Sequence, residues 1–386
     1  MSVVKRKRRV GLLSSGRQDW GILRSTAVEL ASSDSVDLRV LVGGMGCSER
    51  FGRNDRVMAH EGFPPHERLE WMIDGSTAHD DAGRALASVG DALVRQQLDA
   101  LLLVGDRYET LAAAMAATLL RVPIVHLHGG EETEGAFDNA IRNAITKLSH
   151  LHLASHVAYA ERIIAMGEDP KTVHVVGAPG LDNLHRNDLA TRQELEEVLG
   201  LRLDAPLVVV TVHPATLAAT PGADVEAACG AMDAVDATYV VTLPNADPGN
   251  EAVREKLKSA VAAPKRVAVG ALGERRYWGL LRIADAMLGN SSSGLIEAPA
   301  LHLPVVNVGD RQKGRLRSAA VIDVAPDKDC VVAALRQALA PGFRARIRTE
   351  PAPFGDGHAG KAVAAALARW TPPQPPVKRA TPLVLS

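Results

Sequence analysis

The sequence predicts an α/β protein built from two similar domains, each with a parallel sheet covered by helices on both faces. Three observations lead to this prediction. Short β-branched runs alternate with amphipathic helical stretches along the chain, a pattern typical of parallel sheets. The chain has 386 residues, too many for one ordinary hydrophobic core. The alternation lapses between residues 177 and 186 and then begins again.

The first series of elements ends near residue 185. Its strands are expected at Arg9–Leu13, Leu38–Val42, Ala100–Val104, Ile124–Leu127, Leu151–Ala154 and Val173–Val176. Helical patterns lie between them, at Asp19–Ala31, Ala82–Gln97, Arg107–Leu120 and Val157–Met166. Each strand runs into Gly, Ser or His, which is typical of a strand-to-loop turn.

The second series begins after a charged helical stretch, Thr191–Leu199. Its strands are expected at Leu207–Val212, Thr238–Leu243, Val267–Val269, Ala286–Gly289, Val305–Val308 and Ala320–Val324. We therefore expect Rossmann-like domains at residues 1–185 and 186–357, followed by residues 358–386. In this last segment a helix, His358–Trp370, crosses back toward the first domain, and the Pro-containing tail is mobile. Two such halves facing across a cleft suit a two-part ligand such as a nucleotide-sugar.

Composition excludes several classes of protein. Acidic and basic residues number 45 and 44, so no overall field favours nucleic acid or a membrane surface, and no apolar run is long enough to span a bilayer. The three cysteines are far apart and form no CxxC pair, so neither disulfides nor a thiolate metal site is indicated. A cytoplasmic protein is expected. The basic run Lys5–Arg9 is interpreted as the solvated flank of the first strand.

Ionisable side chains are densest between Gly105 and His152. Asp106 follows a predicted apolar strand and could pair with Arg107, while His126 and His128 alternate along the next strand and would share a face. Further acids follow in the loop and helix start beyond, at Glu131, Glu132, Glu134 and Asp138. Helix-dipole complementation accounts for one or two of these acids but not for the set. Carboxylates gathered at the edge of a parallel sheet are suited to proton transfer at carbon.

A Gly/Ser run after the strand Ala286–Gly289 is the main candidate in the second half. It reads Asn290, Ser291, Ser292, Ser293, Gly294 and, about one and a half helical turns in, Glu297. Backbone N–H groups at a helix start, with hydroxyls beside them, would hold a diphosphate, and Glu297 could accept hydrogen bonds from a ribose. Simple capping of the helix by serine explains the same pattern equally well.

Four further strand ends carry polar groups. Arg311 could bind a phosphate, or could belong to a solvated loop. After the first strand, Arg17 could face the cleft, whereas Asp19 could simply cap the first helix. His213 and Asn245 end two strands of the second half, and an isolated histidine is more often structural than catalytic.

Eight blocks occur in order along the chain: GRQDWGIL, GDRYETLAAA, HLHGGEETEGAFDNAIRNAITKLSH, GAPGLDNL, HPATL, LPNADPGN, GNSSSGLIEAP and VNVGDRQKGR. Together they resemble the hydrolysing UDP-N-acetylglucosamine 2-epimerases of sialic acid synthesis. They extend from Gly16 to Arg315 and so cover both predicted domains.

The resemblance implies a GT-B type fold and a dimer that works without a metal or other cofactor. It implies conversion of UDP-N-acetylglucosamine and water to N-acetylmannosamine and UDP, through anti elimination to a 2-acetamidoglucal and hydration. We expect the catalytic residues to be Asp106, Glu131, Asp138 and His213. The expected substrate-binding and nucleotide-binding residues are Arg17, Asp19, Arg107, His128, Asn245, Asn290, Ser291, Ser292, Ser293, Gly294, Glu297 and Arg311.

The chain departs from the family pattern in the first domain. Gln18 and Trp20 replace Ala and Tyr, and the blocks Gly44-Met45-Gly46-Cys47 and Ile141-Arg142-Asn143 each lack a histidine. These changes leave open a variant sugar, such as a 2,4-diacetamido sugar. The sequence is also compatible with a non-hydrolysing epimerase, a GT-B glycosyltransferase or a silent nucleotide-sugar sensor.

Overall fold

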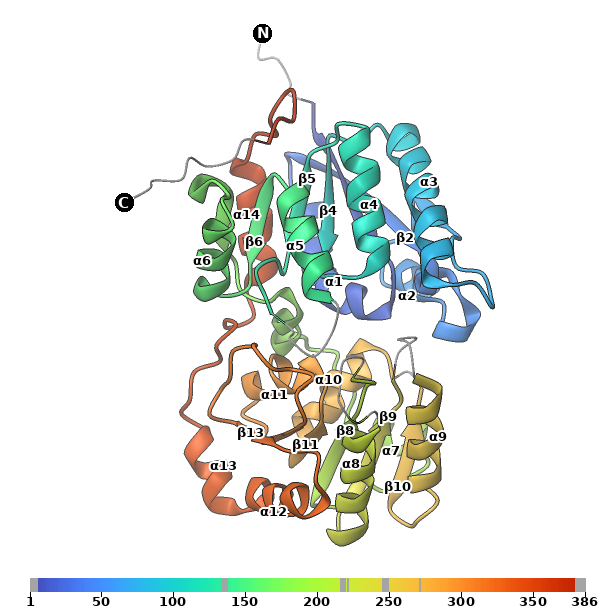
Figure 1. The fold of residues 1–386 in the computed structure, drawn as a ribbon, viewed down its shortest axis with the longest axis vertical. Coiled ribbons are helices and arrows are strands. Elements are labelled where there is room, and N and C mark those ends of the chain that lie inside the picture. Colours follow the sequence, from blue (N-terminus) through green and yellow to red (C-terminus); the bar gives the residue numbers. More distant parts are fainter. Residues whose placement is uncertain are drawn as a thin grey trace. The chain divides into compact units, whose positions relative to one another are not determined.

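The computed structural model describes residues 6–132, 138–215, 220, 222–244, 250–270 and 272–378. Its contacts divide the chain into two units. Unit 1 comprises Met1–Glu131, Asp138–Asp182 and Gly355–Ser386, and unit 2 comprises Glu132–Phe137 and Asn183–Phe354. Each unit contains one parallel sheet with helices on both faces (Figure 1), so two Rossmann-like α/β domains are confirmed.

The sheet of unit 1 has the strand order β3-β2-β1-β4-β5-β6-β7, and all of its strand pairs are parallel. The strand order reverses between β1 and β4, which are hydrogen-bonded neighbours. Ligands of open α/β sheets bind outside the carboxyl ends of strands at such a reversal. The strands are β1 (Arg8–Ser14), β2 (Val36–Gly43), β3 (Glu67–Leu69), β4 (Ala100–Val104), β5 (Ile124–Leu127), β6 (Leu151–Ala154) and β7 (Val173–Val175).

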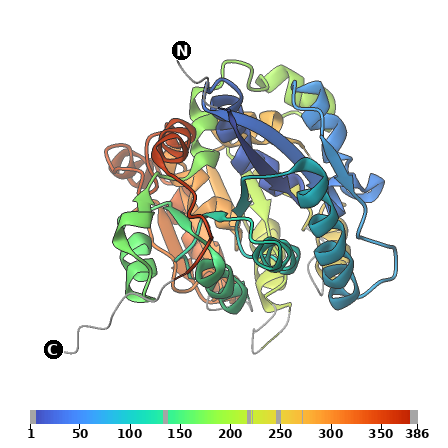
Figure 2. The ribbon, with the colours of Figure 1, turned by 90° about the horizontal axis from the view of Figure 1, so that it is seen from above.

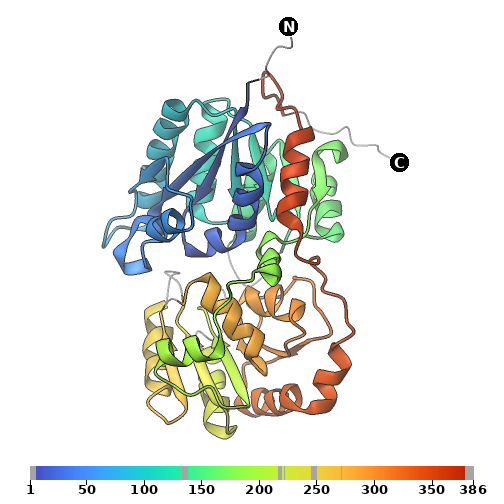
Figure 3. The same ribbon diagram turned by 180° about the vertical axis from the view of Figure 1, so that it is seen from behind.

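Two layers of helices cover this sheet. Helices α1 (Arg17–Ala31) and α14 (Ala359–Arg369) pack on one face (Figure 3), against alternate strand residues such as Leu102. Helices α3 (Ala78–Gln96), α4 (Tyr108–Leu119) and α5 (Asp138–Leu148) cover the other face, on which Leu101 and Leu103 lie. Because α14 belongs to unit 1, the last helix of the chain completes the first domain.

Two short helices and a run of 3-10 turns complete unit 1. The helices are α2 (Asn54–His60) and α6 (Val157–Ala165), and the 3-10 stretch is Pro179–His185. Helices α3 and α4 lie side by side (Figure 2), where Gly90 of α3 leaves room for Ala116 and Leu120. In the part of the chain that the structure describes, no helix is long and apolar enough to cross a bilayer.

The sheet of unit 2 has the order β10-β9-β8-β11-β12-β13, again with every pair parallel, and reverses between β8 and β11. The strands are β8 (Leu207–Thr211), β9 (Thr238–Thr242), β10 (Arg266–Val269), β11 (Ala286–Gly289), β12 (Val305–Val308) and β13 (Val321–Val324). The helices are α7 (Arg192–Leu199), α8 (Ala223–Ala234), α9 (Asn250–Ala260), α10 (Glu274–Ile283), α11 (Glu297–Ala300), α12 (Lys328–Leu339) and α13 (Pro341–Ile347).

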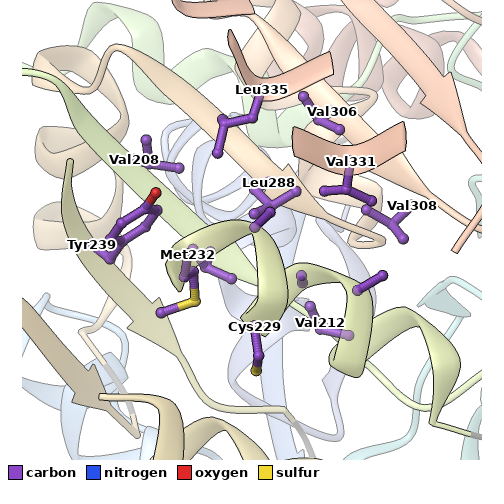
Figure 4. Close-up of a cluster of buried hydrophobic side chains, with 14 of the residues drawn as sticks. Val208, Val212, Cys229, Met232, Tyr239, Leu288, Val306, Val308, Val331 and Leu335 are labelled. Carbon is purple, nitrogen blue, oxygen red and sulfur yellow. The ribbon is translucent and has the colours of Figure 1, made fainter. Parts of the chain in front are cut away.

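A core of aliphatic side chains joins α8 and α12 to one face of this sheet (Figure 4). Met232 of α8 and Leu335 of α12 belong to the same buried cluster as Leu288 and Val306 of the central strands. The opposite face packs against α7 and α10. Strands buried on both faces read as continuous apolar runs, which explains why the sequence reveals them so clearly.

Five strands begin and end where the sequence predicts them, namely β4, β5, β6, β11 and β12. The three-residue strand β3 was not predicted, because it contains two charged residues and lies at the edge of the sheet. The first half of the tail, which we expected to be mobile, contacts unit 1: Lys378 pairs with Glu168 and donates to the carbonyl of Ser149.

Candidate functional site

In unit 1 the loop after β1 is organised by Asp19. One oxygen, Oδ2, accepts hydrogen bonds from the N–H and Oγ of Ser15, both at 2.7 Å, and from the N–H of Gly16 at 3.1 Å. Gly16 is the N-cap of α1, so Asp19 fills the capping role that its position also allowed. Burial raises the pKa of Asp19, against the hydrogen bonds from Ser15.

Arg142 of α5 joins the two loops that carry the predicted acids. Its side chain is 1% exposed. One end of the guanidinium pairs with Asp106 Oδ2, just after β4. The other end donates to the carbonyl of Glu131 at 2.7 Å and to Oδ1 of Asn139 at 2.8 Å. The rigid, always charged guanidinium therefore fixes Asp106 against the Glu131 loop.

The expected pair of Asp106 and Arg107 is wrong. Nε of Arg107 donates to Oε1 of Glu109 at 2.8 Å, while Asp106 pairs with Arg142. Arg107 is the N-cap residue of α4, and its side chain reaches the acid in the first turn of that helix. Glu109 is 1% exposed and therefore requires a positive partner.

Glu131 is held by a second pair of residues. Its Oε1 lies 2.6 Å from Nδ1 of His128 and accepts a hydrogen bond from Ser155 Oγ at 2.8 Å. Ser155 follows β6, so this loop is tied to the neighbouring strand end. The prediction that His126 and His128 alternate on one strand is wrong, because β5 ends at Leu127 and His128 adopts a left-handed backbone (φ 64°).

The remaining acid of the predicted set, Asp138, is the first residue of α5 and lies one helical turn before Arg142. Asp106, Glu131 and Asp138 are thus all positioned by segments that Arg142 contacts or belongs to. His126 lies deeper: it is fully buried, and its Nε2 donates to the carbonyl of Gly105 at 2.9 Å. Burial lowers the pKa of His126 to about 4.

In unit 2 the site is organised around Asn290, which is fully buried after β11. Its Oδ1 accepts from the N–H of His213 at 2.7 Å, and its Nδ2 donates to the carbonyl of His213 at 2.9 Å. The amide also donates to Oδ2 of Asp224 at 2.8 Å. The loop after β8, which carries His213, is therefore fixed to the strand end of β11, at the point where the strand order reverses.

Arg311, which was predicted to bind a phosphate, lies beside Asn290 together with Gln312, which was not predicted. Arg311 donates from NH1 to the Asn290 carbonyl at 3.1 Å, and Gln312 donates to the same oxygen at 2.9 Å. Burial raises the pKa of Asp224, and the hydrogen bond from Asn290 opposes this effect. Gly309 (φ 73°) has no room for a side chain, because a Cβ would lie 2.5 Å from Oδ1 of Asp224.

The serine run forms a tight turn and not the start of a long helix. Ser292–Gly294 is a 3-10 turn, and α11 contains only four residues and begins at Glu297. The prediction that Glu297 lies one and a half turns inside a helix is wrong. Pro299 explains the break, because it has no N–H to donate four residues back and its ring crowds that carbonyl. Ser291 Oγ accepts from the N–H of Ser293 at 3.3 Å, and Ser293 Oγ accepts from the hydroxyl of Tyr277 at 2.7 Å.

Arg17 and Asn245 are two further residues predicted to bind the substrate. Arg17 is the first residue of α1, and Asn245 falls outside the described residues. Gly46, at a block where a histidine was expected, is buried in the 3-10 turn after β2. Its N–H donates to the carbonyl of Ser15 at 3.1 Å, and an added Cβ would lie 2.7 Å from Val42 Cγ1. A side chain at this position would therefore displace its neighbours.

Several residues of these clusters were not among the predicted site residues. Arg142 is 36 residues from Asp106, and Ser155 is 24 residues from Glu131. Tyr277 and Asp224 lie on helices away from the serine run. No local pattern of the sequence marks such pairs, because parallel strands bring together segments separated by a whole helix.

The fold and the two clusters define a two-domain Rossmann-like protein with an acid–base cluster in one unit and a hydroxyl, amide and arginine cluster in the other. The family model for UDP-N-acetylglucosamine 2-epimerase matches residues 28–368. The chain belongs to this epimerase family.

Relatives of known name match most of the chain. A GDP/UDP-N,N'-diacetylbacillosamine 2-epimerase (hydrolyzing) from Campylobacter jejuni is 33% identical over 82% of this chain and 84% of its own. Polysialic acid biosynthesis protein P7 from Escherichia coli is also 33% identical, over 83% of both chains. A UDP-N,N'-diacetylbacillosamine 2-epimerase (hydrolyzing) from Legionella pneumophila is 33% identical over 86% of this chain and 89% of its own.

The fold is also similar to that of solved structures. The crystal structure of a Neisseria meningitidis UDP-GlcNAc 2-epimerase bound to UDP-GlcNAc matches with a TM-score of 0.81. The match covers 93% of this chain and 99% of that chain at 17% sequence identity. At this level of identity the similarity concerns the fold alone.

Proposed function

We propose that this protein is a hydrolysing 2-epimerase of a UDP-activated 2-acetamido sugar, which it converts with water to the free 2-epimeric sugar and UDP. The observation that carries the proposal is the set of acids and imidazole that Arg142 and Ser155 hold together after β4, β5 and β6. A glycosyltransferase, which leaves the hydrogen at C2 in place, has no need of such a set. Family membership supports the epimerase chemistry.

The chemistry requires two tasks. The hydrogen at C2 is barely acidic, so a base must remove it while a good leaving group departs from C1. Positioned acid–base groups contribute roughly 10²–10⁴-fold to such a step. We assign this task to the cluster of Asp106, Glu131 and Asp138 in unit 1.

The second task is to hold the nucleotide and to stabilise the diphosphate as negative charge develops on it. We assign it to unit 2, with His213, Ser291, Ser292, Glu297 and Arg311. Asn290 fixes the His213 loop and Tyr277 holds Ser293, so both act by positioning. No step of this scheme calls for a metal or other cofactor, and we expect activity to survive a chelator.

For the sugar, we propose a 2,4-diacetamido substrate ahead of UDP-N-acetylglucosamine. Two of the 33% identical relatives are named for diacetylbacillosamine, whereas a relative named UDP-N-acetylglucosamine 2-epimerase, from Neisseria meningitidis, is 27% identical. Gly46 stands where the resemblance leads one to expect a histidine, and an added Cβ would lie 2.7 Å from Val42 Cγ1. We therefore expect the sugar to differ from N-acetylglucosamine in its substituents.

The test is incubation of the pure protein with a panel of UDP-sugars in D₂O, including both candidates, followed by mass and NMR analysis. The proposal expects free UDP and a product that carries deuterium at C2. An epimerised sugar still attached to UDP would indicate a non-hydrolysing epimerase. Release of UDP without deuterium at C2 would indicate a transferase or a simple hydrolase. Binding of UDP without turnover of any member would indicate a sensor.

We also propose that the protein is a cytoplasmic homodimer. Three free cysteines, one of them exposed, suit a reducing compartment. Helices α3 and α4, which contact each other, expose several large apolar side chains, including Val94 at 62% and Leu119 at 73%, and exposed apolar surface favours association. L119E is expected to give monomers in sedimentation analysis, while V175E, at an exposed valine of β7, should leave the dimer intact.

A further inference from the structure

We propose that His128 is itself the group that exchanges a proton with the sugar, and that Glu131 orients it. This inference rests on the proposed function. It changes the roles within the acid–base set: Glu131 becomes a positioning residue, and the proton moves at Nε2 of the imidazole.

The hydrogen bonds define the orientation of the ring. Oε1 of Glu131 lies 2.6 Å from Nδ1 of His128 and also accepts the hydroxyl of Ser155 at 2.8 Å. A carboxylate oxygen only accepts hydrogen bonds, so Nδ1 carries a hydrogen in this arrangement. An imidazole whose single hydrogen is at Nδ1 has its lone pair at Nε2. A carboxylate that holds Nδ1–H and leaves Nε2 for the reaction is the arrangement of catalytic histidines in general.

Nε2 of His128 is buried and has no hydrogen-bond partner among the described residues. A buried polar atom without a partner is costly, and such an atom in a native structure calls for an explanation. The ring is also the most accessible of three neighbouring imidazoles. The side chain of His128 is 10% exposed, whereas that of His152 is 1% exposed and His126 is fully buried. His128 is therefore the least enclosed of the three side chains, although Nε2 itself is buried, as is Nδ1 of His126 and of His152, which also lacks a partner in the part of the chain that the structure describes.

The backbone around His128 is held by several contacts. His128 has φ 64°, the left-handed region that side-chain-bearing residues adopt only at a cost. The loop after it is also tightly held: Arg162 donates to the carbonyl of Gly130 at 2.7 Å, and Arg142 donates to the carbonyl of Glu131. These contacts fix the loop that carries the His128 ring.

His126 does not fill the same role. Its Nε2–H is donated to the Gly105 carbonyl, and burial lowers its pKa to about 4. Its Nδ1 faces inward, since the Cβ that Gly129 lacks would lie 3.0 Å from Nδ1 and 3.2 Å from Oγ1 of Thr146. His126 is therefore a neutral structural group.

In the proposed steps Asp106 and His128 act as a pair. In the elimination, Nε2 of His128 takes the C2 proton, the C–H electron pair forms the C1–C2 double bond, and the C1–O electron pair leaves with the diphosphate. In the hydration, the Asp106 carboxylate accepts one proton from the water and passes a proton to C2, the C1–C2 electron pair forms the new C2–H bond, and the water oxygen bonds to C1. His128 then releases the proton that it took from C2 to the solvent. On His128 the proton moves only at Nε2, while the hydrogen of Nδ1 stays hydrogen-bonded to Glu131.

The test compares His128→Asn with the wild type in the D₂O assay. The Asn amide can still donate to Glu131 from the place of Nδ1, but it has no group at Nε2, and Asn tolerates a left-handed backbone. We expect kcat to fall at least 100-fold with KM within about threefold, in line with the loss of one acid–base group. Added imidazole should restore part of the activity to His128→Ala. Calorimetric UDP affinity within about twofold of wild type, with an unchanged circular dichroism spectrum, shows that each variant is folded.

The matched comparison is Glu131→Gln, which keeps a hydrogen-bond acceptor for Nδ1–H. Under this proposal it loses less activity than His128→Asn. The reverse order, or wild-type kcat in His128→Asn, would overturn the assignment and return the proton to Glu131. These outcomes are distinct from failure of the proposed function, because that failure would appear as absence of C2 deuterium in the wild-type product.

Discussion

Glu168→Gln provides a quantitative test of how unit 1 is held together behind the acid–base cluster. The Glu168 side chain accepts from Lys147 of α5 at 2.6 Å, lies 3.1 Å from Nε2 of His152 in β6, and pairs with Lys378 of the tail. Although burial opposes it, these hydrogen bonds lower the pKa of Glu168 from 4.5 to about 2. A carboxyl with a lowered pKa contributes stability above its unfolded-state pKa, and this contribution is lost as the pH falls toward the folded-state pKa.

The size of the effect follows from that pKa. At about 1.4 kcal/mol per tenfold change, the lowered pKa corresponds to roughly 3 kcal/mol. Lys147 is 47% exposed, and solvent screens exposed pairs. We therefore expect Glu168→Gln to lower the free energy of unfolding by about 2 kcal/mol at pH 7. The difference in free energy of unfolding between wild type and Glu168→Gln should stay constant down to about pH 4.5 and then decrease toward zero near pH 2.

The assay is urea unfolding at several pH values, monitored by hydrogen exchange in peptides from β5 and β6. These peptides report on unit 1 separately from unit 2. Glu161→Gln, at an exposed residue of neighbouring α6, is the matched control and should change stability by less than about 0.5 kcal/mol. A difference that does not depend on pH between 7 and 3, or one no larger than that of the control, would refute the reasoning.

Three further substitutions test the clusters. Asp106→Asn should keep UDP affinity in calorimetry and lose nearly all turnover, and retained activity would remove Asp106 from the acid–base set. Ser292→Ala should weaken UDP binding with little effect on kcat at saturation, whereas a lowered stability with normal UDP affinity would favour a purely structural turn. Asn290→Ala should destabilise unit 2 by about 2 kcal/mol, because it leaves buried groups of the His213 loop and Asp224 without their partner; wild-type unfolding and UDP affinity would contradict its positioning role.

The strands were predictable because their signal is local. Ala100–Val104 and Val305–Val308 are buried along their whole length, so continuous apolar residues mark both boundaries. The position of acids at strand ends could likewise be predicted, since parallel strands place their carboxyl ends at one edge. The short turn and helix after Ser291 could not be predicted. Serines mark the start of a helix, and the effect of Pro299 on that helix depends on where the turn begins.

The partners of the acids were not predictable for a different reason. The nearest basic residue in the sequence, Arg107, pairs with Glu109, and the cation that binds Asp106 comes from a helix further along the chain, after β5. Sequence proximity favours the wrong arginine because a βα loop points its consecutive residues in different directions. The same argument applies to Ser155, whose contact with Glu131 exists only because β5 and β6 are neighbours in the sheet.

The two units use the same topology for different chemistry, and the residues at the reversal of strand order decide which. In unit 1 the loops there carry Asp19 and Asp106, and the loop after the adjoining strand β5 adds Glu131 and His128, all groups that can hold or exchange a proton. In unit 2 the equivalent loops carry His213 and Asn290, whose hydrogen bonds fix the backbone, together with hydroxyls and Arg311. A reaction that breaks a C–H bond and releases a diphosphate needs both kinds of site. If His128 exchanges the proton, the imidazole and Asp106 are two separate groups, and two groups on opposite faces of a carbon allow inversion there, since the proton leaves from one face and returns to the other.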